Sequence, residues 1–241
     1  MSETVIDGID YGPLVGLIGV WKGDRGMDVA PEPDDDEYNA YYETLVFEAA
    51  GDVTNAEEQI LSIVRYHQEV SRKSNDEVFH DQVGYWLWEA STGQVIQTLT
   101  IPRAVTLLAG GSARTEKNSV ILEVQAAAGD PDWGIIEAPF MAQKAKTLQF
   151  RHHLAVTGDK LFYQETTLLD IYGKHNYEHT DQNVLKRVQV RPLPTPFLHS
   201  YPGGIYRPFL SGASRYPRSG TRLIGTGLDG LLPIHPSIFY P

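Results

Sequence analysis

The chain has 241 residues, no cysteine, and 31 acidic against 20 basic side chains, for a formal charge of −11. The lack of cysteine excludes disulfides, thiolate metal sites and cysteine nucleophiles. The acidic balance argues against nucleic acid as a partner, because phosphate backbones repel a protein of this charge.

The sequence also argues against membrane insertion and export. No window approaches 18 uninterrupted apolar residues, so no membrane span is predicted. Residues 1–7 carry acids where a secretory signal peptide has basic residues followed by an apolar stretch. We therefore expect a cytoplasmic protein. We also expect three parts along the chain: an N-terminal arm (residues 1–11), a β-barrel (12–190) and a tail (191–241).

The first informative stretch is residues 19–26, which reads Gly-Val-Trp-Lys-Gly-Asp-Arg-Gly and follows an apolar run. A tryptophan between glycines fits the first strand of a closed antiparallel barrel. Buried at the narrow end, Trp21 needs a carbonyl for its N–H, and the glycines let the strand bend and approach its neighbours. Residues 11–18 then predict a short helical turn that closes the base. A tryptophan in any other small core fits the octet equally well.

The acid-rich segment 30–37 could suggest a calcium site, because calcium binds oxygen ligands. It lacks the spacing and the glycine of an EF-hand, so we expect a solvated surface loop.

Strand patterns recur after residue 40. Runs of β-branched and aromatic residues at strand length occupy residues 41–47, 60–70, 83–88 and 95–101. Hairpin turns are predicted at residues 91–94, 110–112 and 157–160. Because no long helical pattern intervenes, the sequence predicts an all-β, up-and-down antiparallel barrel, which leaves no exposed strand edges.

The tail has a different composition. Residues 191–241 hold 9 of the 15 prolines and contain neither lysine nor glutamate. Proline removes donors from β-ladders, so we expect an irregular, disordered segment.

Taken in order, several stretches resemble one family, the nitrobindins. These barrels are similar to lipocalins and fatty-acid-binding proteins, and they include the heme-binding domain of THAP-type proteins. The resemblance spans residues 12–188 and implies about ten strands. The stretches that carry it are residues 19–26, 42–47, 79–86, Pro102 before an apolar run, 145–151 and 173–188.

The resemblance implies a heme b site. In this family a histidine that enters the last strand is the axial ligand of the heme iron, and the spacing from Gly173 to His179 matches. His179 is therefore the expected ligand, and Asp181 or Asn183 is expected to hold its other ring nitrogen. The implied chemistry is the handling of nitric oxide or peroxynitrite at a ferric heme, with isomerisation of peroxynitrite to nitrate as the enzymatic activity.

Other residues are weaker candidates. His175 is the second choice for the ligand. Trp21, His80 and Tyr85 are candidates for the wall of the cofactor site, although His80 also reads as a structural residue, because Gln82 here replaces an acid of the family.

Two other functions stay open. The barrel mouth could hold an apolar small molecule without heme, as in fatty-acid-binding proteins, or the barrel could serve protein contact with a filled interior. A homodimer also stays open. An inward His179 beside an apolar slot indicates heme, a large closed cavity indicates the carrier, and a packed lumen indicates protein contact.

Overall fold

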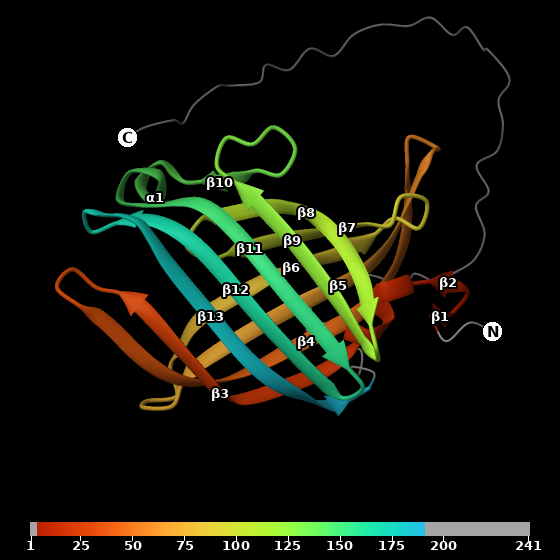
Figure 1. Ribbon diagram of the computed structural model, residues 1–241, viewed down its shortest axis with the longest axis horizontal. Helices are drawn as coiled ribbons and strands as arrows, with labels where there is room; N and C mark the ends of the chain where they lie inside the picture. Colours follow the sequence, from red (N-terminus) through yellow and green to blue (C-terminus); the bar gives the residue numbers. More distant parts are fainter. Residues whose placement is uncertain (1–3, 191–241) are drawn as a thin grey trace, which may run out of the picture. The chain divides into compact units, whose positions relative to one another are not determined.

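The computed structural model describes residues 4–190 and shows a closed barrel (Figure 1). The expectation for residues 191–241 lies outside the described residues. Ten strands pair antiparallel in a ring, and the pairings β8–β9 and β13–β3 close it. This confirms the predicted fold class. The strands are β3 (Gly19–Pro31), β4 (Asp36–Asn55), β5 (Gln59–Arg72), β6 (Val78–Trp88), β7 (Gln94–Ile101), β8 (Val105–Glu116), β9 (Ser119–Ala127), β11 (Ala145–Thr157), β12 (Lys160–Ile171) and β13 (Lys174–Gln189).

Smaller elements lie at the two ends of the ring. A hairpin of β1 (Val5–Ile6) and β2 (Ile9–Asp10) leads into the 3₁₀ helix η1 (Gly12–Leu17), the predicted helical turn. We call the η1 end the base. The opposite end, which we call the mouth, carries the β3–β4 and β12–β13 turns, and β10 (Ile135–Glu137) and α1 (Pro139–Lys144) lie near it (Figure 1). None of the described helices is long and apolar enough to cross a membrane.

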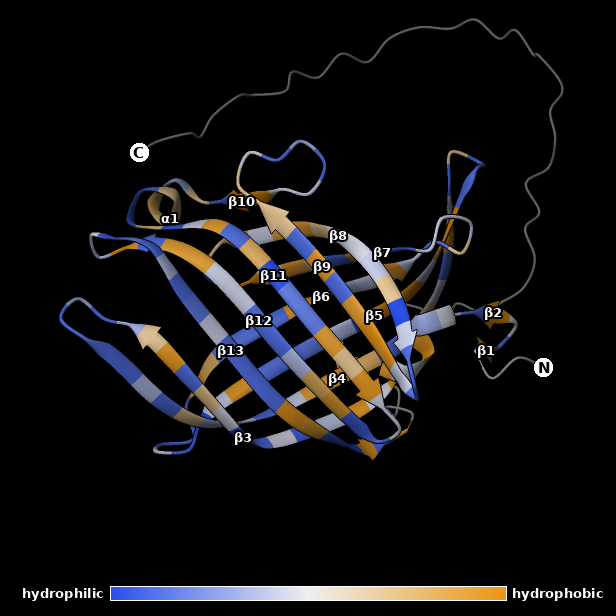
Figure 2. Cartoon of the chain, in the orientation of Figure 1, coloured by the Kyte–Doolittle hydropathy of each residue, from blue (hydrophilic) through white to orange (hydrophobic). Residues whose placement is uncertain are grey.

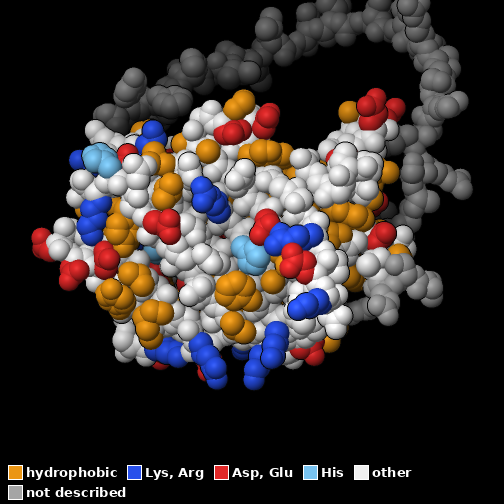
Figure 3. Space-filling model, viewed as in Figure 1, with side chains coloured by type: hydrophobic (Ala, Val, Ile, Leu, Met, Phe, Trp, Pro, Cys, Tyr) orange, Lys and Arg blue, Asp and Glu red, His pale blue; other side chains and the backbone are white. Residues whose placement is uncertain are grey.

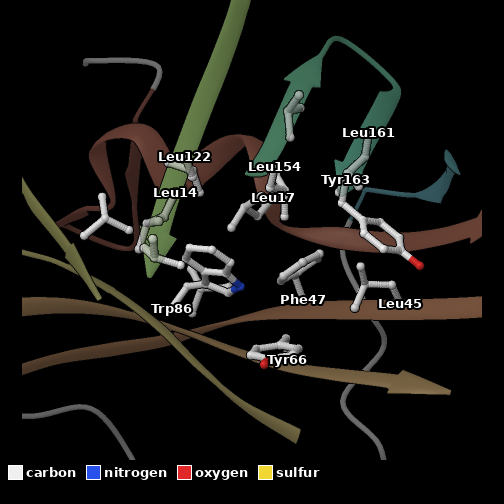
Figure 4. Close-up of a cluster of buried hydrophobic side chains, with 14 of the residues drawn as sticks. Leu14, Leu17, Leu45, Phe47, Tyr66, Trp86, Leu122, Leu154, Leu161 and Tyr163 are labelled. Carbon is white, nitrogen blue, oxygen red and sulfur yellow. The ribbon is translucent and has the colours of Figure 1, made fainter. Parts of the chain in front are cut away.

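The interior of the base half is filled by large side chains. Alternation along each strand sends one face inward, and hydropathy alternates visibly along the strands (Figure 2). Trp86 and Phe47 are fully buried between the strands and Leu14 and Leu17 of η1 (Figure 4). These side chains close the base.

Trp21 is fixed at the base by two contacts. Its indole N–H donates to the Leu17 carbonyl at 2.6 Å, and the Arg187 guanidinium lies 4.2 Å from its ring centroid. Arg187 in turn donates to the carbonyls of Gly16 and Gly158 at 2.9 and 3.1 Å. One cation therefore ties β13 to η1 and to the β11–β12 turn, and it lies over the buried tryptophan.

One predicted turn is wrong. Gly110 and Gly111 lie inside β8, and the hairpin that follows turns at residues 117–118. A Cβ at position 110 would collide with the Trp133 ring, and one at position 111 would collide with the Glu123 carbonyl. These glycines allow close packing within the barrel wall, and no turn is made there. The turns at residues 91–94 and 157–160 are confirmed.

The first and last strands of the ring, β3 and β13, are paired only near the base. The ladder between β13 and β3 comprises Lys186↔Lys22, Arg187↔Trp21 and Gln189↔Val20, all near the base. Toward the mouth, β13 continues its pairing with β12 to Lys174, and β3 continues its pairing with β4 to Pro31. We call this stretch, where β3 and β13 face each other beyond their ladder, the seam.

We expect Trp21→Ala to lower the free energy of unfolding by about 3–5 kcal/mol, because it empties a fully buried site. Urea denaturation measures this. Val188→Ala, at an exposed position on β13, is the control and should change stability little. A loss below about 1 kcal/mol for Trp21→Ala would contradict this account of the base.

Candidate functional site

His179 faces the barrel interior near the mouth. It shares strand parity with Leu185, which is fully buried. The two positions are six residues apart, so His179 lies about 20 Å along the strand from Leu185, toward the mouth. About 28 % of its side chain is exposed, and its Nε2 lies 2.8 Å from Oδ1 of Asp28 on β3. The imidazole is thus held across the seam.

The carboxylate that holds His179 differs from the two expected. Asp181 accepts a hydrogen bond from Tyr41 at 2.5 Å, and its other oxygen lies 3.1 Å from the Tyr163 hydroxyl. Asn183 donates to Glu43 at 3.3 Å. The expectation that Asp181 or Asn183 holds the ring is therefore wrong. Parity puts both side chains inside, but each bonds with the polar groups that meet below the mouth.

Those polar groups form a layer across the lumen. Tyr163 donates to Glu43 at 2.9 Å, and Gln68 donates to the same oxygen at 3.1 Å. The Tyr41 ring lies against Gly26, where a Cβ would overlap it. We call this layer the floor; its members are Tyr41, Glu43, Gln68, Tyr163, Asp181 and Asn183. It separates the mouth from the apolar base.

The acids in this region are shifted toward their neutral forms. Burial raises the pKa of Glu43 to about 7, despite the hydrogen bonds it accepts. Burial, together with the charge of Asp181, raises the pKa of Glu165 to about 8. Burial also raises the pKa of Asp181. Desolvation disfavours the charged form of each carboxyl, so the lumen can hold protons at neutral pH.

A second polar group lies deeper in the lumen. His152 on β11 is buried, and its Nδ1 lies 3.0 Å from Oε1 of Gln97. Gln97 and Gln82 both donate to the Tyr66 hydroxyl, at 3.0 and 2.9 Å. His80 lies nearer the mouth end of β6, where its Nε2 is 3.1 Å from Oε1 of Gln82, and burial lowers its pKa. His80 thus faces the lumen, bonded to an amide.

Two of the expected cofactor contacts lie away from the interior of the mouth. Tyr85 lies on the outer face of β6 with 44 % of its surface exposed, because alternation sends its neighbour Trp86 inward. Trp21 is at the base, where its N–H donates to the Leu17 carbonyl and its ring faces the Arg187 guanidinium. His175 is 79 % exposed beside Asp170 at the β12–β13 turn. Of the histidines proposed from the sequence, His179 and His80 face the interior.

The outer wall carries an open groove of about 670 Å³ over β8, β9, β11, β12 and β13, with both polar and apolar side chains in its lining. It lies on the face toward the viewer in Figure 3, where a histidine lies beside charged and hydrophobic side chains. Glu123, within it, is ion-paired with Arg114 and His153. The described residues show no cluster of three or more His, Cys, Asp or Glu side chains that could hold a metal ion.

The sequence analysis missed the role of His152 and of Tyr163. The sequence does carry a signal for the inward position of His152, because it shares strand parity with Phe150 and Leu154, which are both buried. A histidine in register with apolar neighbours predicts an inward polar group. Its partners come from other strands, and a single sequence does not reveal them.

The raised carboxyl pKa values predict that stability falls as pH rises. A carboxyl whose folded pKa lies above its unfolded value of about 4.5 favours folding most when protonated, so its contribution is lost between about pH 4.5 and pH 8. We expect the melting temperature to fall over this range and Glu165→Gln to make the fall smaller. Glu178→Gln, at an exposed position, is the control. An unchanged slope in Glu165→Gln would contradict the shift.

Comparison with known proteins agrees with this architecture. The crystal structure of Rv2717c from M. tuberculosis aligns with a TM-score of 0.55 and 21 % identity, covering 72 % of this chain and 94 % of that one. At this identity the likeness shows the fold alone. No curated protein matches the chain. Residues 10–187 match the family described as "THAP4-like, heme-binding beta-barrel domain". The match covers most of the chain, and the chain therefore belongs to this heme-binding β-barrel family, whose cofactor is heme.

Proposed function

We propose that this protein binds heme at the barrel mouth, with the imidazole of His179 as the axial ligand. The observation that carries the proposal is the position of His179, which faces inward at the mouth and is held by Asp28 at 2.8 Å. Ligating histidines in proteins are commonly oriented by a carboxylate in this way. The family match supports the choice of cofactor.

The mouth, where His179 lies, offers a better place for a heme than the deep lumen does. Below the floor, the cavity between Trp86, His152 and Tyr163 measures about 10 Å³, room for about one water molecule. The floor itself is made of hydrogen-bonded polar side chains. The packed lumen and the floor favour a heme above the floor, in a shallow position beside the seam.

Held by His179, a heme would supply an iron that can bind a small gas or anion. We propose nitric oxide or peroxynitrite as that molecule, and isomerisation of peroxynitrite as the reaction. Asp28 would orient the His179 ring. Asp181 and Tyr41, joined at 2.5 Å, would separate the mouth from the interior of the barrel. The cytoplasmic location and the homodimer remain predictions.

The heme-free carrier is less well supported. An apolar ligand the size of a fatty acid requires a cavity of hundreds of Å³, whereas the lumen cavity beside His152 measures about 10 Å³. The packed lumen agrees with the third function, protein contact. Heme binding at the mouth and protein contact give opposite results in a hemin titration.

We expect His179→Ala to abolish high-affinity heme binding, because alanine cannot replace a directional bond from imidazole to iron. Absorption titration with hemin measures this through the Soret band, and circular dichroism verifies that the barrel remains folded.

His175→Ala and His80→Ala are the matched controls, one exposed at the turn and one facing the lumen. Both should change heme affinity far less. Unchanged affinity and spectrum in His179→Ala would refute the ligand assignment. A natural protein without a saturable Soret band at one heme per chain would refute heme binding itself.

Asp28→Asn should weaken heme binding by roughly 10–100-fold, the usual effect of removing the partner of a ligating histidine. The amide keeps the size of the carboxylate and loses its charge. Asp36→Asn, also at the mouth but paired with Lys174, is the control. Equal affinities for both variants would show that Asp28 does not support the ligand.

A further inference from the structure

One buried atom lacks a partner in the centre of the barrel. Nε2 of His152 is fully buried and accepts no hydrogen bond from any described residue. Arg187 Nε shares this burial, but it lies 3.1 Å from the Asp159 carboxylate. A buried polar atom without a partner lowers the stability of the fold by about 1–3 kcal/mol. A hydrogen-bonding ligand beside His152 would remove this cost.

The chemistry of the missing partner follows from the other side of the ring. The amide nitrogen of Gln97 donates to Tyr66, so its Oε1 is the end that faces His152 Nδ1. Nδ1 therefore carries the proton. Burial lowers the pKa of His152 to about 3, which keeps the ring neutral. Nε2 then has a free lone pair, and its partner must be a hydrogen-bond donor.

The size of the partner follows from the cavity. His152 lines an internal cavity of about 10 Å³ together with Tyr66, Gln68, Gln82 and Tyr163 on its polar side. A space of this size holds one water molecule, and a buried water usually has two to four polar partners. A second heavy atom would meet the surrounding apolar wall, which is made of Leu45, Phe47, Trp86 and Leu154.

We propose that this cavity is a binding site for a single water molecule that donates a hydrogen bond to Nε2 of His152. The neighbouring groups are already engaged. Tyr66 accepts from two amides and donates to the Thr98 carbonyl at 3.2 Å, and Tyr163 bonds to Glu43 and Asp181. One donor is thus enough to satisfy the site.

The water has a structural consequence. The cavity is bordered by Gln68 and Tyr163 of the floor and by Tyr66 and His152 of the deeper group. A molecule in it touches both groups. Its bond to His152 extends the deeper group, which includes Gln97, toward the floor. This site is independent of heme, because it lies below the floor.

Nitrogen NMR of the intact protein, with no variant, gives the first test. The tautomer with the proton on Nδ1 should be observed, and the Nε2 resonance should be shifted from that of a free lone pair toward that of a hydrogen-bond acceptor. A crystal structure of the protein should place one water within hydrogen-bonding distance of Nε2. A free lone pair, or the Glu165 carboxyl in contact with Nε2, would overturn the proposal.

Oxygen-17 relaxation dispersion then counts long-lived internal waters in solution. The double variant H152F/Q97M replaces His152 and its hydrogen-bonding partner Gln97 with apolar side chains of similar size. It should hold one water fewer than the natural protein. His153→Phe changes the next residue, on the outer face, and should leave the count unchanged. Equal counts in a folded double variant and in the natural protein would overturn the proposal.

Discussion

The contact between Arg187 and Trp21 is the constraint on which the barrel depends. β13 and β3 are the last and first strands of the ring, and they share a short ladder near the base. Arg187 strengthens that junction, because it lies over Trp21 and donates to carbonyls of η1 and of the β11–β12 turn. The three backbone pairs that close the ring are thus reinforced by the contact between a cation and a buried indole.

At the mouth, β3 and β13 have no backbone ladder between them, because their pairing ends near the base. Beyond the ladder, side chains hold β13 to its neighbours: Asp28 of β3 holds His179, and Asp36 at the start of β4 holds Lys174. These are polar contacts at the edge of the lumen, where water is available. The floor below them carries its carboxyls in a desolvated setting, and this difference explains why the pKa values of Glu43 and Asp181 are raised.

The sequence predicted the parts of the fold that depend on local pattern. Alternation and turn residues indicated the strands, and the glycine–tryptophan octet indicated the base, where Trp21 donates to a carbonyl as expected. Contacts that depend on register between distant strands were not predicted. Asp28 reaches His179 because β3 shifts its register between Gly23 and Gly26. The misread turn at Gly110 has the same origin, since Trp133, which covers it, comes from a later loop.

The seam also bears on how the barrel opens. A closed ring has its weakest segment where backbone pairing stops, and here that segment includes His179. Local opening should begin along β3 near Asp28 and along β13 near His179, because these edges rely on side chains that exchange readily with solvent. The strand amides that face the seam should therefore exchange with deuterium before those of β4 and β12. Fluctuations of the native barrel would then expose its candidate ligand histidine without unfolding the base.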